Sequence, residues 1–176
     1  YKKIAILPIY ITSKRRTLIK KNLNIGLAGE HIVMSDIILQ GYSCFKMQEN
    51  LPFDLVMLDA KNKMYRIQVK STIKRKTNYH SKNKISYSFG VTRQRRVLKK
   101  KNNNTYVKHK ENEYKKSDFD ILALVIISLK KVFYIKYKDL KLKYVSLNGN
   151  EKMPLYKCLE NPIVDEDLIE KIKRCY

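Results

Sequence analysis

Residues 52–70 of the chain, PFDLVMLDAKNKMYRIQVK, combine two apolar strand-like segments with a polar turn between them. Segments 54–58 and 64–70 have strand composition, and the Asp, Asn and Lys residues of 59–63 are typical of a turn. The pattern therefore predicts a β-hairpin. If the hairpin turns near positions 61 and 62, cross-strand partners have numbers that sum to about 122–124, so Asp54 faces Gln68 to Lys70.

The second strand of this hairpin carries an alternation of polar and apolar side chains. A strand repeats every two residues, which puts Gln68 and Lys70 on one side and Ile67 and Val69 on the other. Asp54, Gln68 and Lys70 are then expected to meet at one place. A carboxylate, an amide oxygen and an ammonium group together suit a hard divalent cation and a phosphate.

The same alternation has a second interpretation. Arg66, Gln68 and Lys70 could form the solvated face of an edge strand, with Asp54 as a surface partner of Lys70. The pattern by itself leaves both interpretations open.

The remaining periodicity predicts the surroundings of the hairpin. Apolar positions at helical spacing indicate a helix from Asn24 to about Gln40, which Gly41 ends. Further strands are expected at 42–46, 84–91, 121–129 and 131–137, a turn at 148–149, and a helix at 165–174. Helix, strands and then helix predict an α/β (α+β) domain with a mixed central β-sheet flanked by helices.

The expected organisation is a single domain over 1–176. It comprises a basic, β-prone N-terminal arm (1–22), a core (24–137) and a C-terminal extension with a helix (138–176). Residues 92–110, rich in Lys and Asn, are predicted to form a loop.

Charge is distributed unevenly along the chain. The 176 residues are 44% hydrophobic, which is a globular composition, and carry a formal net charge of +22. Segment 60–110 contains 17 Lys and Arg residues and no acid. A long stretch of one sign indicates a contact surface for a polyanion, so nucleic acid is the expected partner.

Three basic clusters are candidates for DNA contact. Lys74, Arg75 and Lys76 directly follow the second strand of the hairpin and are expected beside the phosphates. Arg93, Gln94, Arg95 and Arg96 include the residue types that recognise base edges, because Arg pairs with guanine and Gln with adenine. Segment 99–101 is expected to neutralise backbone phosphates.

Other polar residues give weaker signals. The three cysteines, at positions 44, 158 and 175, are far apart, lack ligand-like spacing and are interpreted as reduced, which suits an intracellular protein. The histidines at 31, 80 and 109 are isolated, which disfavours a histidine–metal nuclease. Asp36 is expected to be exposed, and Asp59 is explained by the turn. No segment is long and apolar enough to span a membrane, and 4–11 lacks the features of a signal peptide.

The order of these motifs resembles a known family. Gly29-Glu30, Gly41-Tyr42, Pro52-Phe53-Asp54 and Gln68-Val69-Lys70 resemble the PD-(D/E)XK nuclease superfamily. The likeness is greatest to the branch of group I intron-associated homing endonucleases, which also has Gln at the position of the motif's second acid. It covers residues 24–72 well and 118–137 more loosely.

The resemblance implies a role for each matching residue. Glu30 would be the helix-borne acid, Asp54 the principal metal ligand and Gln68 a weaker ligand, with the Val69 carbonyl completing the metal shell. Lys70 would orient or activate the attacking water and stabilise charge on the phosphate. The implied cofactor is Mg²⁺, with Mn²⁺ as the alternative ion.

The resemblance also implies a function and an assembly. The expected activity is site-specific cleavage of double-stranded DNA by a homodimer or homotetramer, since a small one-site nuclease usually cuts both strands as a symmetric oligomer. Two rivals stay open. One is a structure-specific resolvase of the same superfamily, and the other is a catalytically silent DNA-binding module, which the neutral Gln68 keeps open.

Overall fold

The predicted hairpin forms with the predicted pairing. The computed structural model describes residues 13–48, 50–73, 76–78, 84–101, 104–141 and 143–163. Within it, β2 (Leu55–Leu58) and β3 (Met64–Thr72) are antiparallel, and Leu55 is the partner of Ile67. The Asp59 carboxylate accepts hydrogen bonds from the backbone N–H groups of Lys61 and Lys63, both at 2.9 Å, which fixes the turn.

β3 is the middle strand of the main sheet. The sheet has the order β1-β2-β3-β8-β9, where β1 is Ser43–Lys46, β8 is Ile121–Ile126 and β9 is Lys131–Lys136. β3 pairs antiparallel with β2 and parallel with β8, so the sheet is mixed, as predicted. The interpretation of β3 as an edge strand with a solvated face is wrong, because strands cover both of its edges.

The strand predicted at 121–129 is shorter than expected. β8 ends at Ile126, and Ile127–Leu129 forms a single turn of 3₁₀ helix. Lys130 then adopts a left-handed conformation with φ of 51°, which reverses the chain into β9. A second 3₁₀ turn, Tyr137–Asp139, follows β9, and a third is Leu155–Cys158.

Helix α1 (Ser13–Leu39) begins earlier than the periodicity predicts. The prediction of a β-prone arm is wrong for residues 13–22, which are helical. This segment contains no Gly or Pro and is rich in Lys and Arg, both good helix formers. Gly41, with φ of 84°, follows the last turn and ends the helix as predicted.

The buried face of α1 lies between Gly29 and Ile37. Asp36 belongs to this face and is only 8% exposed, so its expected exposure is wrong. Its carboxylate accepts hydrogen bonds from the Gln40 side chain, at 2.8 Å, and from the Tyr134 hydroxyl of β9, at 2.5 Å. Asp36 therefore joins the helix to the sheet. Helical periodicity alone does not predict its partner, because Tyr134 is distant in the sequence.

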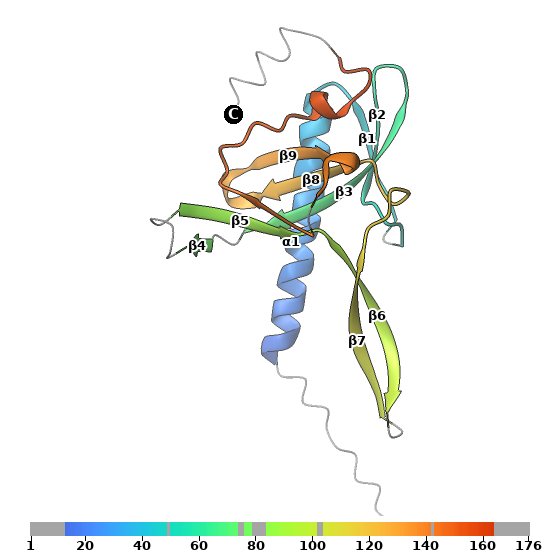
Figure 1. Cartoon of the computed structure of the whole chain (residues 1–176), viewed down its shortest axis with the longest axis vertical. Coiled ribbons are helices and arrows are strands. Elements are labelled where there is room, and N and C mark those ends of the chain that lie inside the picture. The colour runs from blue at the N-terminus through green and yellow to red at the C-terminus, as the bar shows by residue number, and fades with distance from the viewer. Residues whose placement is uncertain are drawn as a thin grey trace, which may run out of the picture.

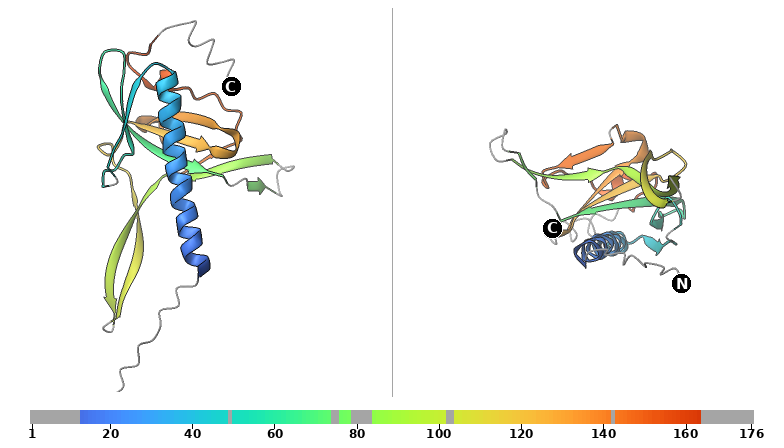
Figure 2. Two further views of the ribbon diagram at one scale, coloured as in Figure 1. Left: turned by 180° about the vertical axis from the view of Figure 1, so that it is seen from behind. Right: turned by 90° about the horizontal axis from the view of Figure 1, so that it is seen from below.

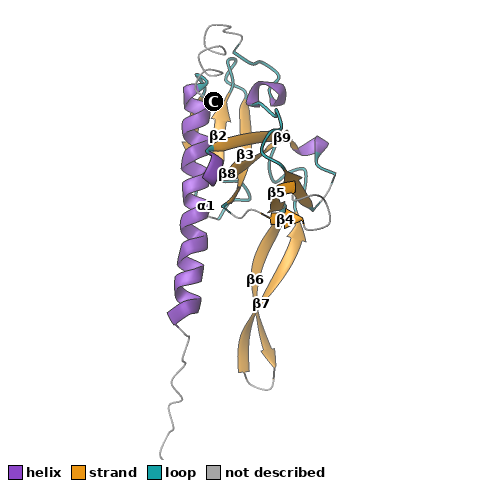
Figure 3. Ribbon diagram, turned by 90° about the vertical axis from the view of Figure 1, so that its left-hand side faces the viewer, coloured by secondary structure: helices purple, strands orange, loops and turns teal. Residues whose placement is uncertain are grey.

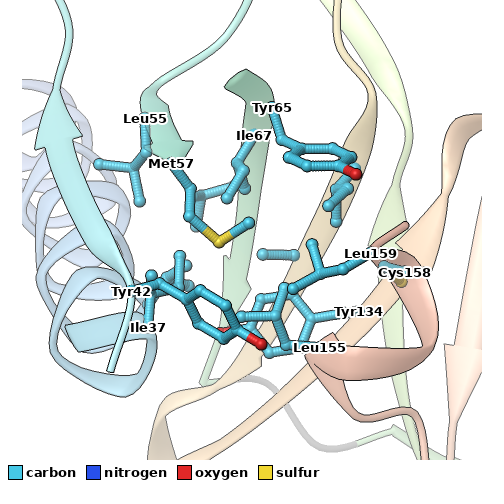
Figure 4. Packing of buried hydrophobic residues seen from close by; sticks show 14 of the residues in the cluster. Ile37, Tyr42, Leu55, Met57, Tyr65, Ile67, Tyr134, Leu155, Cys158 and Leu159 are labelled. Atoms are coloured by element: carbon cyan, nitrogen blue, oxygen red, sulfur yellow. The ribbon is translucent and has the colours of Figure 1, made fainter. Parts of the chain in front are cut away.

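Two apolar clusters cover the two faces of the main sheet. On the α1 side, the buried residues include Tyr42, Met57, Ile67 and Leu155. Figure 4 shows these side chains packed between the helix, the strands and the 3₁₀ turn at Leu155. The other cluster is centred on Phe119 and includes buried residues of β5 and β8.

A smaller sheet packs against this second cluster. It has the order β10-β5-β4, where β10 is Tyr144–Leu147, β5 is Lys84–Gly90 and β4 is Lys76–Asn78. In β5, Tyr87 and Phe89 are buried, as the alternation of 84–91 predicts.

The predicted loop at 92–110 is wrong. β6 (Thr92–Lys101) and β7 (Asn104–Glu113) form a long two-stranded ribbon. Figure 1 shows this ribbon extending away from the sheets, and Figures 2 and 3 show the first half of α1 extending from the same end of the molecule. The segment also contains strand formers such as Val97, Tyr106 and Val107, which the Lys-rich composition obscures.

Both ends of the chain lie outside the part that the structure describes. The predicted C-terminal helix at 165–174 and Cys175 lie outside the described residues, as do positions 1–12. Cys44 and Cys158 are free thiols. Among the described helices, none is long and apolar enough to cross a membrane.

Candidate active site

Asp54 lies immediately before β2 and is anchored to β3. Its backbone N–H donates to the Ile67 carbonyl at 2.9 Å, which continues the hairpin pairing by one residue. Its Oδ2 accepts hydrogen bonds from the Val69 N–H, at 2.7 Å, and from Gln68 Nε2, at 2.5 Å. These two are the hydrogen bonds of the Asp54 carboxylate to described residues, so Oδ1 is left available to another partner.

The environment of Asp54 disfavours its charged form. Burial raises the pKa of Asp54, the Val69 hydrogen bond, Lys70 and Lys46 lower it, and the Glu30 charge raises it, so that the pKa is about 6. A desolvated carboxylate near a second carboxylate is a group that a bound cation would stabilise.

Gln68 is 7% exposed and its side chain lies between two oxygen atoms. Its Nε2 donates to Asp54 Oδ2 at 2.5 Å and to the Val69 carbonyl oxygen at 3.1 Å. Both acceptors are oxygens of the kind that bind Mg²⁺. A half turn of the amide about its last side-chain bond exchanges Nε2 for Oε1, which would add a third oxygen to this set.

Lys70 follows on the same strand and is enclosed by the root of the ribbon. Its Nζ donates to the Thr92 carbonyl at 3.3 Å and lies 5.3 Å from the centre of the Tyr114 ring. Burial lowers the pKa of Lys70, and the charge of Asp54 opposes this effect. The ammonium group is therefore held by a carbonyl and an aromatic face.

Glu30 reaches the same region from α1. It forms an ion pair with Lys46 of β1, with 2.9 Å between Nζ and Oε2, and its charge acts on Asp54. The preceding Gly29 has no side chain, which allows α1 to approach β3 closely. A Cβ at position 29 would lie 2.5 Å from Cβ of Ser71, and the Ser71 hydroxyl donates to the Ile25 carbonyl at 2.9 Å.

The candidate catalytic residues Glu30, Asp54, Gln68 and Lys70 thus lie in one region of the structure. Among described residues, no three His, Cys, Asp or Glu side chains gather closely enough to hold a metal ion by themselves. A cation here would therefore depend on the neutral oxygens of Gln68 and Val69 besides Asp54 and Glu30. The donor set is all oxygen, which fits Mg²⁺ or Mn²⁺.

Three neighbours of the site were not predicted from the sequence. Lys46 is brought in because β1 pairs with β2, and the Met47 N–H donates to the Asp54 carbonyl at 2.9 Å. Lys70 is also contacted by Thr92, the first residue of β6, and by Tyr114, the residue that follows β7. The pairing of β6 with β7 brings Thr92 and Tyr114 together, and a loop at 92–110 does not predict this proximity.

Only some of the candidate DNA-binding residues belong to the part of the chain that the structure describes. Lys74 and Arg75 lie outside the described residues, and Lys76 is the first residue of β4. Arg93, Gln94, Arg95 and Arg96 occupy successive positions in β6. Segment 92–96 therefore starts beside Lys70 and continues along the ribbon.

Comparison with known proteins identifies the family. A protein-family model described as PD-(D/E)XK endonuclease matches residues 21–149. The chain belongs to this family. The matched range contains Glu30, Asp54, Gln68 and Lys70, and the mixed sheet with its helix is consistent with the PD-(D/E)XK fold. Endonucleases of this family generally use divalent metal ions.

One solved structure to which the chain is similar is that of a bacterial homing endonuclease, I-Ssp6803I. The two share 14% sequence identity, and the match covers 85% of this chain and 94% of that chain with a TM-score of 0.48. No curated protein matches the chain.

Proposed function

We propose that this PD-(D/E)XK endonuclease cleaves double-stranded DNA at a specific site, as a homing-type enzyme that depends on Mg²⁺. The observation that carries the proposal is the cluster of Asp54, Gln68 and Lys70 on paired strands, with Lys70 held at the root of the basic ribbon. The candidate catalytic residues therefore lie next to the basic ribbon, whose charge suits phosphates.

Each residue has a distinct task in this proposal. A divalent cation, when bound, stabilises charge on the scissile phosphate and favours deprotonation of the attacking water. Asp54 and Glu30 supply the carboxylates that hold the cation, and Gln68 and the Val69 carbonyl supply neutral oxygens. The Lys70 ammonium orients the water and stabilises negative charge that develops on the phosphate.

Double-stranded DNA is the proposed substrate because the chain contains long basic segments without acids. The first half of α1 is basic and contains no acid, and segment 60–110 is free of acids over its whole length. We propose contacts to phosphates at Lys74, Arg75 and Lys76, and further DNA contacts along β6. A homodimer or homotetramer would cut both strands, and the enzyme would act on DNA inside the cell.

The experiment that tests this function is digestion of a randomised linear duplex library with Mg²⁺, followed by sequencing of the cut ends. Discrete ends that share one sequence would support a site-specific endonuclease. Cleavage confined to branched junctions would instead support the resolvase, and binding without any cleavage would support the silent module.

Cation binding at Asp54 is expected to give a thermal signature. A raised pKa in the folded protein means that the neutral form of Asp54 contributes stability below pH 4, and that this contribution is lost as the pH rises through about 6. A divalent cation replaces the proton above that pH. Saturating Mg²⁺ should therefore raise the melting temperature by about 5 °C or more at pH 7.5, and by less at pH 5.

The measurement is differential scanning fluorimetry of EDTA-treated protein with added Mg²⁺. Asp54→Asn should remove the Mg²⁺-induced shift, while Asp139→Asn, which removes an exposed carboxylate elsewhere, should retain it. An equal shift at both pH values, or a full shift in Asp54→Asn, would place the cation away from Asp54.

A further inference from the structure

The pairing of β6 with β7 sorts the charges of the ribbon onto two faces. Opposite residues of an antiparallel pair share a face, and successive residues alternate between faces. Arg93 is opposite Asn112, and the pairing continues without interruption to Lys101 opposite Asn104. One face, here called the basic face, therefore contains six cationic positions: Arg93, Arg95, Lys99, Lys101, Lys108 and Lys110.

The other face, here called the neutral face, has a different composition. Its charged positions are Arg96, Lys100, Glu111 and Glu113, so two bases are balanced by two acids. The basic face has no acid. A general excess of Lys and Arg would not separate the acids from six bases in this way, so the segregation indicates that only one face meets a polyanion.

The root of the ribbon shows how the faces are directed. On the neutral face, Glu113 forms an ion pair with Lys143, with 2.7 Å between Oε1 and Nζ. On the basic face, every second residue of β7 leads from Lys108 through Lys110 and Asn112 to position 114, just after the strand. The ring of Tyr114 lies 5.3 Å from Lys70 Nζ. The neutral face is thus engaged by the segment before β10, and the basic face leads toward Lys70.

Arg93 provides a second link between the basic face and the active site. Burial raises the pKa of Tyr114, the charge of Asp54 raises it further, and the charge of Arg93 opposes both effects. The first cation of the basic row is therefore close enough to act on a residue that contacts Lys70.

We propose that the β6–β7 ribbon binds the DNA duplex through its basic face alone, in a row of contacts that begins beside the scissile phosphate. The inference rests on the proposed DNA-cleaving function and refines it, because Arg96 and Lys100 are assigned to the side away from DNA. A two-stranded ribbon has the width that the major groove admits. Figures 1 and 3 show it projecting far beyond the sheets, where a duplex could lie along it.

Neighbouring positions offer a closely matched test. Arg95→Gln/Lys99→Gln removes one Arg and one Lys from the basic face, and Arg96→Gln/Lys100→Gln removes the same pair from the neutral face. The two double variants change the net charge equally, and each substituted position in one variant is the chain neighbour of a substituted position in the other. Each phosphate contact contributes about 0.9 to the slope of log affinity against log salt concentration. The first variant should therefore lose about 1.8 of this slope, and the second should keep the wild-type slope.

The measurement is fluorescence anisotropy of a labelled duplex in Ca²⁺ across a salt series, with melting temperatures to compare folding. Equal losses in the two variants, a larger loss in the neutral-face variant, or no loss in either would overturn the proposal. Lysine acetylation of the wild-type protein gives a test without substitutions. DNA should protect Lys99 and Lys101 while Lys100 stays reactive, and equal protection of all three would also overturn it.

The same preparations separate this inference from the proposed function. Wild-type protein that binds and cuts DNA, together with equal responses of the two faces, would refute the basic-face assignment and leave the nuclease intact. Wild-type protein that binds no duplex would refute both. Wild-type binding without cleavage, with loss confined to the basic-face variant, would support the ribbon assignment and refute the nuclease.

Discussion

Replacing Asp54 with Asn is expected to lower the rate of DNA cleavage on the order of 10³-fold while DNA binding stays intact or becomes slightly tighter. The carboxylate is the anionic oxygen group nearest to Gln68 and Val69, and Asn removes its charge without removing an acceptor for the Val69 N–H. The fold should therefore persist. Single-turnover cleavage at saturating enzyme measures the rate, and anisotropy in Ca²⁺ measures binding.

Substitutions at Gln68 provide the controls for this result. Gln68→Glu adds a carboxylate beside Asp54 and should be tolerated, with tighter Mg²⁺ binding, whereas Gln68→Ala removes the amide oxygen and should be badly impaired. Cleavage by Asp54→Asn at near the wild-type rate would remove Asp54 from the site. Full activity in both Gln68 variants would show that this position only supports the strand.

The hairpin that carries these residues could be predicted because its determinants are local. The Asp59–Lys63 turn fixes the pairing, and pairing alone brings Asp54 beside Gln68. Burial of Gln68 could not be predicted in the same way. It follows from the parallel pairing of β3 with β8, where Gln68 is the partner of Leu122, and that contact is distant in sequence.

The ribbon shows why the rest of the site escaped prediction. Strand formation in 92–113 depends on pairing between β6 and β7, and the many Lys and Asn residues gave a stronger local signal for a loop. Because Thr92 and Tyr114 reach Lys70 only through this pairing, their place in the site does not follow from local sequence. In α1, by contrast, good helix formers start the helix at Ser13, well before the apolar periodicity begins.

Lys70→Ala is expected to lower cleavage by about 10²–10³-fold, the range found when one donor that stabilises developing charge is removed. Its Nζ is held by the Thr92 carbonyl and the Tyr114 ring, so it is positioned before substrate binds. The slope of affinity against salt should change little, because Lys70 acts at one phosphate during reaction and not along the duplex. Single-turnover rates and the anisotropy salt series distinguish these two effects.

Lys46→Ala is the matched control for Lys70→Ala. Both lysine charges lower the pKa of Asp54, so either substitution should move the acidic limb of the pH–rate profile to higher pH. At alkaline pH, where Asp54 is ionised in every variant, Lys46→Ala should recover most of its activity because its partner is Glu30. Lys70→Ala should not recover, since the lost ammonium group acts on the phosphate itself. If both variants recover their cleavage rate at high pH, Lys70 acts only by lowering the pKa of Asp54. If both lose the same activity at every pH, Lys70 has no chemical role distinct from that of Lys46.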